Sequence, residues 1–200
     1  MGRDEARQSK KRYHHGDLKA SLIVAALAGL DANGEVPTMR GLAGVLSVSR
    51  AAAYRHFSDR SDLMAHVTAR CFDEMICEID AAVDLDELMI EQHRRACAAY
   101  LSYGVRYASR YDLMFGRDTL MHENAVARQA RDQAFSKLIA MAGDTGADDP
   151  ELLALTVWST LHGGVDLLRR AHLPVTNQPE PAAVIQAVLN VAVQTLWPEG

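Results

Sequence analysis

Apolar positions along this chain of 200 residues recur mainly three and four residues apart, the spacing that places side chains on one face of an α-helix. One such run lies within residues 17–31 and consists of Leu18, Leu22, Ala25, Ala26 and Leu30. No segment shows sustained alternation of apolar and polar residues with β-branched side chains, so the sequence indicates no sheet. The pattern predicts an all-α protein.

Proline marks the ends of the predicted helices. The six prolines leave positions 38–149 without proline, and this interior is rich in Ala, Leu, Met and Arg, which favour helix. Thr38 and Ser49 are suited to begin helices, because their hydroxyl oxygens accept free backbone N–H groups. We expect about nine helices, over approximately 17–31, 38–46, 49–57, 58–80, 86–108, 110–117, 122–142, 150–171 and 180–196.

Residues 38–57 contain two short helical patterns separated by a tight turn, and another helix follows directly. This is the arrangement of a helix-turn-helix, whose second helix lies in the major groove of DNA. On the first turn of that helix, Arg50 is suited to bidentate contact with guanine, and the small side chains of Ala51 and Ala52 permit close approach to bases. The pattern predicts double-stranded DNA as the partner.

Tyr54 and His56 lie further along the same helix and are better placed for phosphates than for bases. Each also has a purely structural interpretation: Tyr54 as a core aromatic and His56 as a capping or packing residue. Arg55 between them is interpreted as a solvated charge. Ala53 and Phe57, spaced four apart, are expected to face the core of this segment.

Charge is distributed unevenly along the chain. The net charge of −5 is the sum of +4 over residues 1–60 (ten Lys/Arg, six Asp/Glu) and −9 over residues 61–200 (eleven and twenty). A basic N-terminal part attracts phosphate, and an acidic remainder repels DNA and so orients the basic part toward it. Lys10, Lys11 and Arg12 belong to a basic arm that either follows the phosphates or is a solvated tail.

Composition argues against a membrane protein, a secreted protein and a metal-binding protein. A hydrophobic fraction of 48% with 24% charged residues is typical of a globular protein. No apolar run reaches the length of a bilayer span, and the basic N-terminus lacks the apolar core of a signal peptide, so we expect a cytoplasmic protein without a membrane partner. The three cysteines are expected to be reduced and mostly buried, with a redox switch as the alternative. We expect no cofactor and no metal, because the pair His14-His15 has no third ligand in view.

Several spaced motifs within residues 13–63 are similar to those of one family. They are YHHGDL at 13–18, LAGVLSVS at 42–49, YRHF at 54–57, and Arg60 followed by Leu63. The segment resembles the DNA-binding head of the tetracycline-repressor (TetR) family. The resemblance implies that Thr38 and Arg40 contact DNA and that Arg60 opens the next helix and binds a phosphate. The predicted DNA-binding set is Arg12, Thr38, Arg40, Ser49, Arg50, Ala51, Ala52, Tyr54, His56 and Arg60.

Two departures from the family pattern concern stability. Ser47 stands where the family prefers glycine in the turn, so a left-handed backbone there costs about 1 kcal/mol. Gly41 and Gly44 each weaken the first helix of the pair by a similar amount. These departures indicate a less stable DNA-binding head with the same fold.

Three parts are expected: a flexible arm over 1–12, a helix-turn-helix domain over 13–60 and a larger helical ligand-binding and dimerisation domain over 61–200. In the last part, YDLMFG at 111–116 and WSTLHGG at 158–164 resemble the Trp-His-Gly (WHG) type of TetR C-terminal domain. Trp158 and His162 lie one turn apart on a helix. The two glycines that follow allow a neighbouring helix to approach, so this motif either lines a ligand pocket or only seats a helix crossing.

Aromatic and thioether side chains elsewhere in this part suit a moderately apolar small molecule, although any core contains such residues. The candidate ligand-binding residues are Tyr100, Tyr103, Tyr107, Met114, Phe115, Met121, Trp158 and His162. The helices over 150–171 and 180–196 are expected to form a homodimer surface. The stretch AAVIQAVLNVAVQTLW at 182–197 carries no charge and is apolar on almost every face, so exposing one side is unfavourable.

The resemblance implies a transcriptional regulator that binds a pseudo-palindromic operator as a dimer and, as a repressor, is released by a small-molecule ligand. The alternative is a dimeric DNA-binding or architectural regulator that needs no ligand. An enzyme is not expected. His93, Cys97 and the pair His122-Glu123 form neither a nucleophile–base pattern nor a metal-binding cluster in the sequence.

Overall fold

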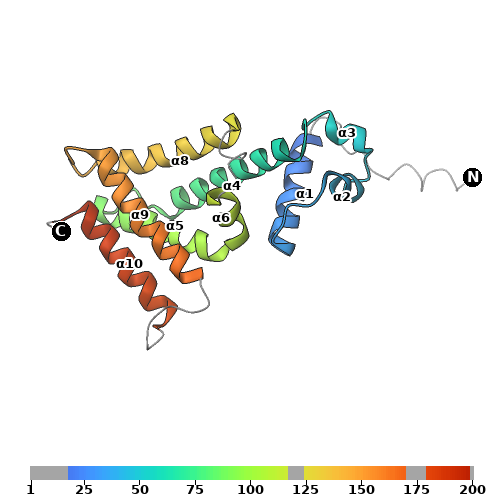
Figure 1. The fold of residues 1–200 in the computed structure, drawn as a ribbon. Coiled ribbons are helices and arrows are strands. Elements are labelled where there is room, and N and C mark those ends of the chain that lie inside the picture. Colours follow the sequence, from blue (N-terminus) through green and yellow to red (C-terminus); the bar gives the residue numbers. More distant parts are fainter. Residues whose placement is uncertain (1–17, 117–123, 170–178, 199–200) are drawn as a thin grey trace, which may run out of the picture. The chain divides into compact units, whose positions relative to one another are not determined.

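The computed structural model describes residues 18–116, 124–169 and 179–198. The regular structure in these ranges is helical (Figure 1). Nine helices and no strand lie in these ranges. This confirms the prediction of an all-α fold. The chain divides into two compact units, Met1–Val67 and Thr68–Gly200, and the division falls inside a helix that contributes residues to both.

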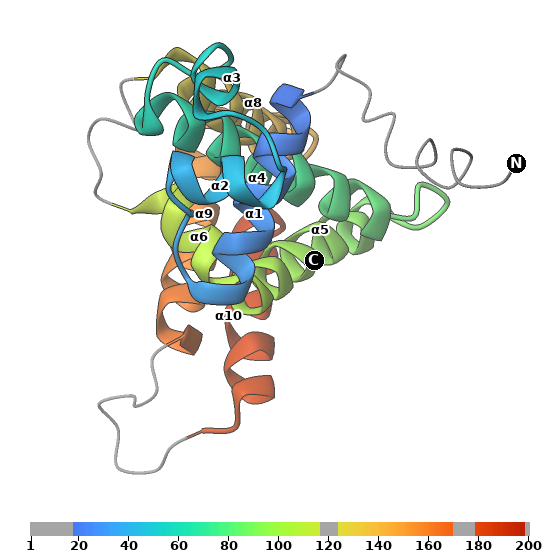
Figure 2. The same ribbon diagram turned by 90° about the vertical axis from the view of Figure 1, so that its right-hand side faces the viewer.

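The first unit, which we call the head, contains three helices and the first part of a fourth: α1 (Leu18–Asn33), α2 (Met39–Val45), α3 (Arg50–Tyr54) and α4 (Arg60–Ala82). The first three pack against one another (Figure 2). Leu22, Leu42 and Phe57 are almost fully buried between them. Burying an apolar side chain of this size contributes about 1.5–3 kcal/mol, so these contacts stabilise the short helices.

α3 is shorter than predicted, because its last turn tightens. The backbone N–H groups of Arg55 and His56 donate to the carbonyl oxygens three residues earlier, at 3.3 and 3.0 Å. Such bonds end an α-helix. The chain then turns Phe57 into the core, as predicted, while the helix itself ends at Tyr54.

The second unit, which we call the body, continues from α4 into five further helices: α5 (Met89–Arg106), α6 (Ala108–Phe115), α8 (Ala125–Gly143), α9 (Pro150–Arg169) and α10 (Pro181–Leu196). α9 lies beside α8, α5 and α10 (Figures 1 and 2). Among the described helices, none is both long enough and apolar enough to cross a membrane.

Two glycines set how closely α9 approaches its neighbours. A Cβ added at Gly104 of α5 would lie 2.6 Å from Val165 Cγ1 of α9, and one at Gly164 of α9 would lie 2.6 Å from Val188 Cγ1 of α10. Carbon atoms repel strongly at that separation, so the crossings need glycine. The predicted close approach of a helix is confirmed at Gly164. At Gly163 an added Cβ meets no described atom within 4 Å.

The second half of α4 is held to α5 and α6 by polar contacts. The Tyr103 hydroxyl donates to the Cys71 carbonyl oxygen at 3.0 Å. The nearly buried Arg110 guanidinium pairs with Glu74 at 2.6 Å, and Arg106 pairs with Glu78. A charge-assisted bond at a buried guanidinium is stronger than one at the surface, so these contacts fix the position of α4 within the body.

We expect Ser47→Gly to raise the free energy of unfolding of the head by up to about 1 kcal/mol. Ser47 is exposed and has a φ of 54°, in the left-handed region, as its place in the turn predicted. Glycine relieves the backbone strain there and loses no packing. Urea unfolding followed by circular dichroism measures the change, and Ser47→Ala, which keeps the Cβ, should show no gain. A less stable glycine variant would contradict the strain argument.

Candidate DNA-binding surface and ligand cavity

Two side-chain caps build the helix-turn-helix. The Thr38 hydroxyl accepts the backbone N–H of Gly41, and the Ser49 hydroxyl accepts that of Ala52, each at 3.1 Å. Both caps were predicted and are confirmed. Each satisfies a backbone donor that the first turn of a helix leaves free, so the start of each helix is well defined.

The exposed face of α3 differs in one residue from the predicted one. Arg50, Ala51 and His56 are exposed, and Tyr54 keeps 45% of its surface accessible, which opposes its interpretation as a core aromatic. Ala52 is only 8% exposed. We therefore correct the prediction that Ala52 reaches bases. Ala52 lies next to Ala53 on the side of α3 that packs against α1 and α2. The base-facing part of the first turn is reduced to Arg50 and Ala51.

Three arginines occupy the first or second position of three successive helices: Arg40 in α2, Arg50 in α3 and Arg60 in α4. All three are exposed. A cation at the start of a helix is unfavourable by about 0.3–1 kcal/mol, because the helix dipole is positive there. Within the described residues, no carboxylate pairs with Arg40 or Arg50, and Arg60 donates to the Val36 carbonyl oxygen at 2.9 Å. Folding alone therefore does not account for their positions.

The surrounding sequence strengthens the positive charge of this surface. Residues 36–58 contain three arginines and no Asp or Glu. A cationic surface without neighbouring acids attracts the phosphates of DNA. Thr38 and Arg40 lie at the start of α2 and are exposed as well. Arg12 and the rest of the predicted basic arm lie outside the described residues.

The body contains a cavity of about 710 Å³, which we call the body cavity. Its walls come from α4, α5, α6, α8 and α9. Most lining side chains are apolar or aromatic. They include five of the predicted ligand-binding residues: Tyr100, Met114, Phe115, Trp158 and His162. This volume lies within the range of about 300–1,000 Å³ typical of small-molecule sites.

Four side chains at one end of the body cavity form a hydrogen-bonded chain, which we call the aromatic relay. Trp158 Nε1 donates to the Tyr100 hydroxyl at 3.1 Å. The hydroxyls of Tyr100 and Tyr111 lie 2.7 Å apart. Tyr111 in turn lies 2.5 Å from His162 Nδ1. The ring of Phe115 packs against those of Tyr111, Trp158 and His162, with centroids 4.6–6.0 Å apart.

Burial keeps the aromatic relay uncharged. It raises the pKa of Tyr100 to about 12 and that of Tyr111 further, and it lowers the pKa of His162. Near neutral pH, both tyrosines therefore keep their protons and His162 is a neutral imidazole. The sequence indicated Trp158 and His162 through their helical spacing and Tyr100 as one of several aromatic residues. Tyr111, which joins them, was part of the YDLMFG motif but was not among the predicted ligand-binding residues.

A second polar group lies elsewhere in the cavity wall. His93 Nδ1 accepts the Trp197 indole N–H at 3.1 Å, and its Nε2 lies 3.9 Å from Asp144. Burial lowers the pKa of His93. Lys137 and Asp80, which also line the cavity, are paired with each other. These residues come from α4, α5 and α8 and from the segments that follow α8 and α10, so no local motif predicted their meeting.

Two predicted ligand-binding residues lie outside the cavity lining, which corrects their assignment. Tyr103 is fully buried and faces α4, where its hydroxyl bonds to Cys71. Tyr107 lies after the end of α5, and its ring stacks with the guanidinium groups of Arg106 and Arg110 at 4.7 and 4.2 Å. Met121 lies outside the described residues.

Sequence reasoning missed most of the wall that α4 contributes. Phe72, Met75, Ile76 and Ile79 line the cavity at helical spacing, and an apolar stripe of this kind is visible in the sequence. It is equally the signature of a packed core. Only the tertiary structure distinguishes a stripe that faces a cavity from one that faces another helix.

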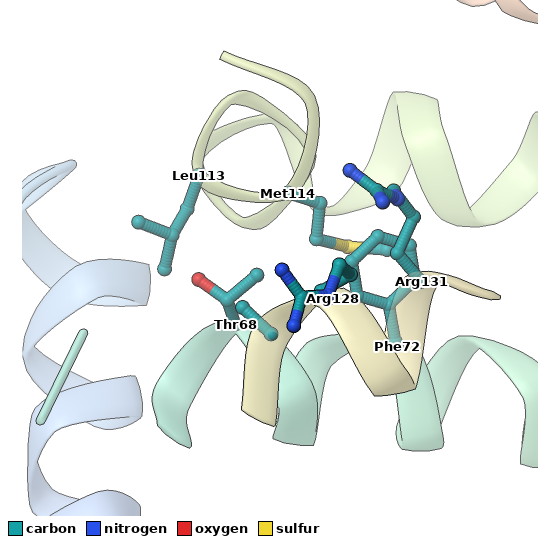
Figure 3. A pocket seen from close by; sticks show the side chains of 7 residues that line it. Thr68, Phe72, Leu113, Met114, Arg128 and Arg131 are labelled. Atoms are coloured by element: carbon teal, nitrogen blue, oxygen red, sulfur yellow. The ribbon is translucent and has the colours of Figure 1, made fainter. Parts of the chain in front are cut away.

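A second, much smaller pocket lies between α4, α6 and α8 (Figure 3). Its volume is about 10 Å³, enough for one water molecule. The Thr68 hydroxyl is buried there without a hydrogen-bond partner among the described residues. Arg128 and Arg131 line the same pocket. A single water accepting from an arginine and bonding to Thr68 would satisfy the hydroxyl, so this pocket suits a structural water and is too small for an organic ligand.

Cys97 also lines the body cavity, but burial raises its pKa to about 12. Its thiol therefore stays protonated near neutral pH and is a poor nucleophile. Cys71 is buried as predicted, whereas Cys77 is exposed. The lining of the body cavity, which is mostly apolar and aromatic, suits the binding of a small molecule.

A helix-turn-helix head joined by one helix to a helical body with an apolar cavity is the organisation of a DNA-binding regulator. The model of the family "Tetracyclin repressor-like, C-terminal domain" matches residues 93–192, half of the chain. The chain therefore belongs to the TetR family of transcriptional regulators. Members of this family are generally non-enzymatic transcription factors that bind DNA operators, typically as dimers. The search against curated proteins found no match.

Solved structures share the fold over nearly the whole chain. A protein of unknown function from Rhodococcus sp. RHA1 is 22% identical, with a TM-score of 0.75 over 94% of this chain and 98% of that one. A transcriptional regulator from the same organism is 16% identical, with a TM-score of 0.67 over 90% and 96%. The TetR-family regulator PfmR from Thermus thermophilus is 18% identical, with a TM-score of 0.56 over 88% and 96%. At these identities the likeness shows a common fold.

Stability should fall as the pH is lowered from about 7.5 to about 5.5. Burial lowers the pKa of His66, His93 and His162 in the folded protein, whereas the unfolded chain binds the same protons near the ordinary value of 6.5. The unfolded state therefore binds more protons below pH 6.5, and stability present above that pH is lost as the pH falls toward the lowered values. Urea unfolding at the two pH values measures this. The double variant His93→Gln/His162→Phe should show a smaller fall, and an equal fall would contradict the assignment.

Proposed function

We propose that the protein is a dimeric transcriptional repressor that binds a pseudo-palindromic operator through α3 and is released when a small molecule occupies the body cavity. One observation carries the proposal: the same chain combines an exposed cationic helix-turn-helix with a mostly apolar cavity in a separate unit. A regulator that needs no ligand has no use for such a cavity, which favours the ligand-responsive alternative.

Phosphates of the operator would offset the unfavourable placement of the head's arginines. Arg40 and Arg60 lie in the first turns of α2 and α4, where phosphates are also attracted by free backbone N–H groups. Thr38, Ser49, Tyr54 and His56 are exposed polar groups on the same unit and are suited to further backbone contacts. Arg50 and Ala51 would then read base edges in the major groove. In the absence of DNA, the unfavourable interaction of these arginines with the helix dipoles lowers the stability of the head.

An exposed apolar face on α9 and α10 is the proposed dimer interface. Leu152 and Leu167 of α9 are 60% and 43% exposed, and Val191 of α10 is 51% exposed. Gly163 lies on α9 between the two leucines and faces open space, which permits a second helix to approach closely. Burying such a face in a two-fold dimer removes apolar surface from water.

The hydroxyl groups on this face do not oppose burial, because they are already satisfied. Thr156, Ser159 and Thr195 each donate to the carbonyl oxygen four residues earlier, at 2.9, 2.8 and 2.7 Å. A polar group that keeps its hydrogen bond when water is excluded loses little on burial. The face therefore behaves as nearly apolar, which supports a protein interface over a solvated surface.

Release would proceed through α4, the helix that both units share. Its first residue, Arg60, belongs to the proposed phosphate contacts, and its later residues Phe72, Met75 and Ile79 line the body cavity. A ligand that favours one position of α4 changes the spacing of the two α3 helices in the dimer. By linkage, DNA binding then lowers the affinity for ligand by the same factor.

Selection from a random-sequence duplex library tests the proposal directly. Repeated capture by the purified dimer should enrich an inverted repeat whose half-sites lie roughly 34–36 Å apart, or a multiple of that, centre to centre. Footprinting should show protection of both halves. Failure to enrich any sequence at low salt, with the dimer confirmed, would contradict the assignment as a sequence-specific repressor.

Arg50→Ala should weaken specific operator binding by about 1–3 kcal/mol per half-site, because a bidentate base contact is lost. Arg55→Ala is the matched control: it removes the same charge from the end of α3, where bases are out of reach, and should weaken binding less. Fluorescence anisotropy on the selected duplex measures both, with size-exclusion chromatography to confirm that each variant is a dimer. Unchanged affinity in the Arg50 variant would remove that residue as a base reader.

Leu152→Glu and Val191→Glu should each convert the dimer to monomer, because the interface would bury an unpaired carboxylate. Both side chains are exposed within one chain, so the monomer tolerates the change. Val105→Glu, at another partly exposed valine of the body, is the control and should remain dimeric. Sedimentation velocity distinguishes the two states. Dimers in both test variants would place the interface elsewhere.

A further inference from the structure

We propose that the body cavity takes an uncharged, predominantly apolar molecule whose one hydrogen-bond acceptor, such as a carbonyl oxygen, receives the Nε2–H of His162. The inference rests on the proposed function, in which this cavity is the ligand site. It adds the chemical class of the ligand and the atom that recognises it.

The direction of the hydrogen bonds in the aromatic relay follows from Trp158, its first member. An indole nitrogen can only donate, so Trp158 donates to the Tyr100 oxygen. The Tyr100 hydroxyl then has one hydrogen to place, and its remaining neighbour among the described residues is the Tyr111 oxygen. In the opposite direction, the buried Tyr100 oxygen would accept twice and its own hydrogen would lack an acceptor, which is unfavourable.

This direction fixes the tautomer of His162. With Tyr100 donating to Tyr111, the Tyr111 hydroxyl donates to His162 Nδ1. A neutral imidazole that accepts at Nδ1 carries its hydrogen at Nε2. Burial favours the neutral ring, since it lowers the pKa of His162. Within the described residues, no side chain or carbonyl accepts from Nε2, and His162 lines the cavity. The relay thus presents a donor without a partner.

The rest of the lining excludes a charged ligand. Arg131 pairs with Asp132 at 3.0 Å, and Lys137 pairs with Asp80, so these four charges already have counter-charges. The fifth, Asp144, is more than half exposed and keeps its hydration. A charge on the ligand would lose its own hydration without gaining a free partner. The sum of the lining charges is −1, which further disfavours an anion.

Benzophenone and diphenylmethane test this inference, because they share one skeleton and differ only in a carbonyl against a methylene group. Isothermal titration calorimetry of the full-length dimer gives both affinities, and quenching of tryptophan fluorescence in a Trp197→Phe background, which leaves Trp158 as the one indole, reports the site. We expect benzophenone to bind about tenfold more tightly, the effect of one hydrogen bond in an apolar site. The anion 4-benzoylbenzoate should bind more weakly than benzophenone.

Two variants assign the difference to His162. His162→Phe keeps an aromatic ring in the stack but cannot donate, so the affinity ratio of the two probes should fall to about one. Phe135→Leu is the matched control: it lines the same cavity outside the relay. It should weaken both probes alike and leave the ratio unchanged. Circular dichroism confirms that both variants are folded.

The outcomes separate the inference from the function on which it rests. Equal affinity of the unaltered protein for the two probes would overturn the acceptor assignment, while the cavity would remain a ligand site. A ratio that persists in His162→Phe would overturn the role of His162, and tighter binding of the carboxylate would overturn the uncharged class. Failure of both neutral probes to bind would overturn the cavity as an apolar ligand site, and the inference with it.

Discussion

The close packing of α9 against α5 and α10 is the constraint on which the body depends. It requires glycine at two crossings, Gly104 and Gly164, since a Cβ at either would lie 2.6 Å from a valine methyl. This position of α9 brings Trp158 and His162 against the tyrosines of α5 and α6. Trp158 and His162 also line the body cavity, so the position of α9 places the aromatic relay at the wall of that cavity.

The buried polar groups of the aromatic relay form hydrogen bonds with one another, and these bonds determine which hydrogen faces the body cavity. Each hydroxyl of the aromatic relay has both a donor and an acceptor neighbour, so burial costs little and the hydrogens have one favourable direction. The head follows the opposite principle. Arg40, Arg50 and Arg60 lie at helix starts that disfavour cations. The two tyrosine hydroxyls of the aromatic relay are satisfied within the chain, whereas Arg40 and Arg50 are exposed in the head without a carboxylate partner among the described residues.

The sequence predicted best what depends on neighbours along the chain. The caps at Thr38 and Ser49 involve atoms three residues apart, and the left-handed turn at Ser47 follows from the motif around it. The pairing of Trp158 with His162 follows from helical spacing alone. Predictions failed where long-range packing decides. Ala52 is buried because of how α3 lies in the head, and Tyr103 packs against α4, where its hydroxyl bonds to Cys71, outside the lining of the body cavity.

Amino-acid order was therefore enough to predict the all-α fold, the helix-turn-helix with its caps, and the basic character of the first part of the chain. These features arise from hydrophobic periodicity, local hydrogen bonds and charge, which depend on residues within one or two turns. Three arrangements are visible only in the folded protein: the apolar stripe of α4 faces a cavity, Tyr111 completes a hydrogen-bonded chain to His162, and His93 meets Trp197 from 104 residues away. The reason is physical: these arrangements depend on how whole helices cross, which is set by many side chains together and by no local motif.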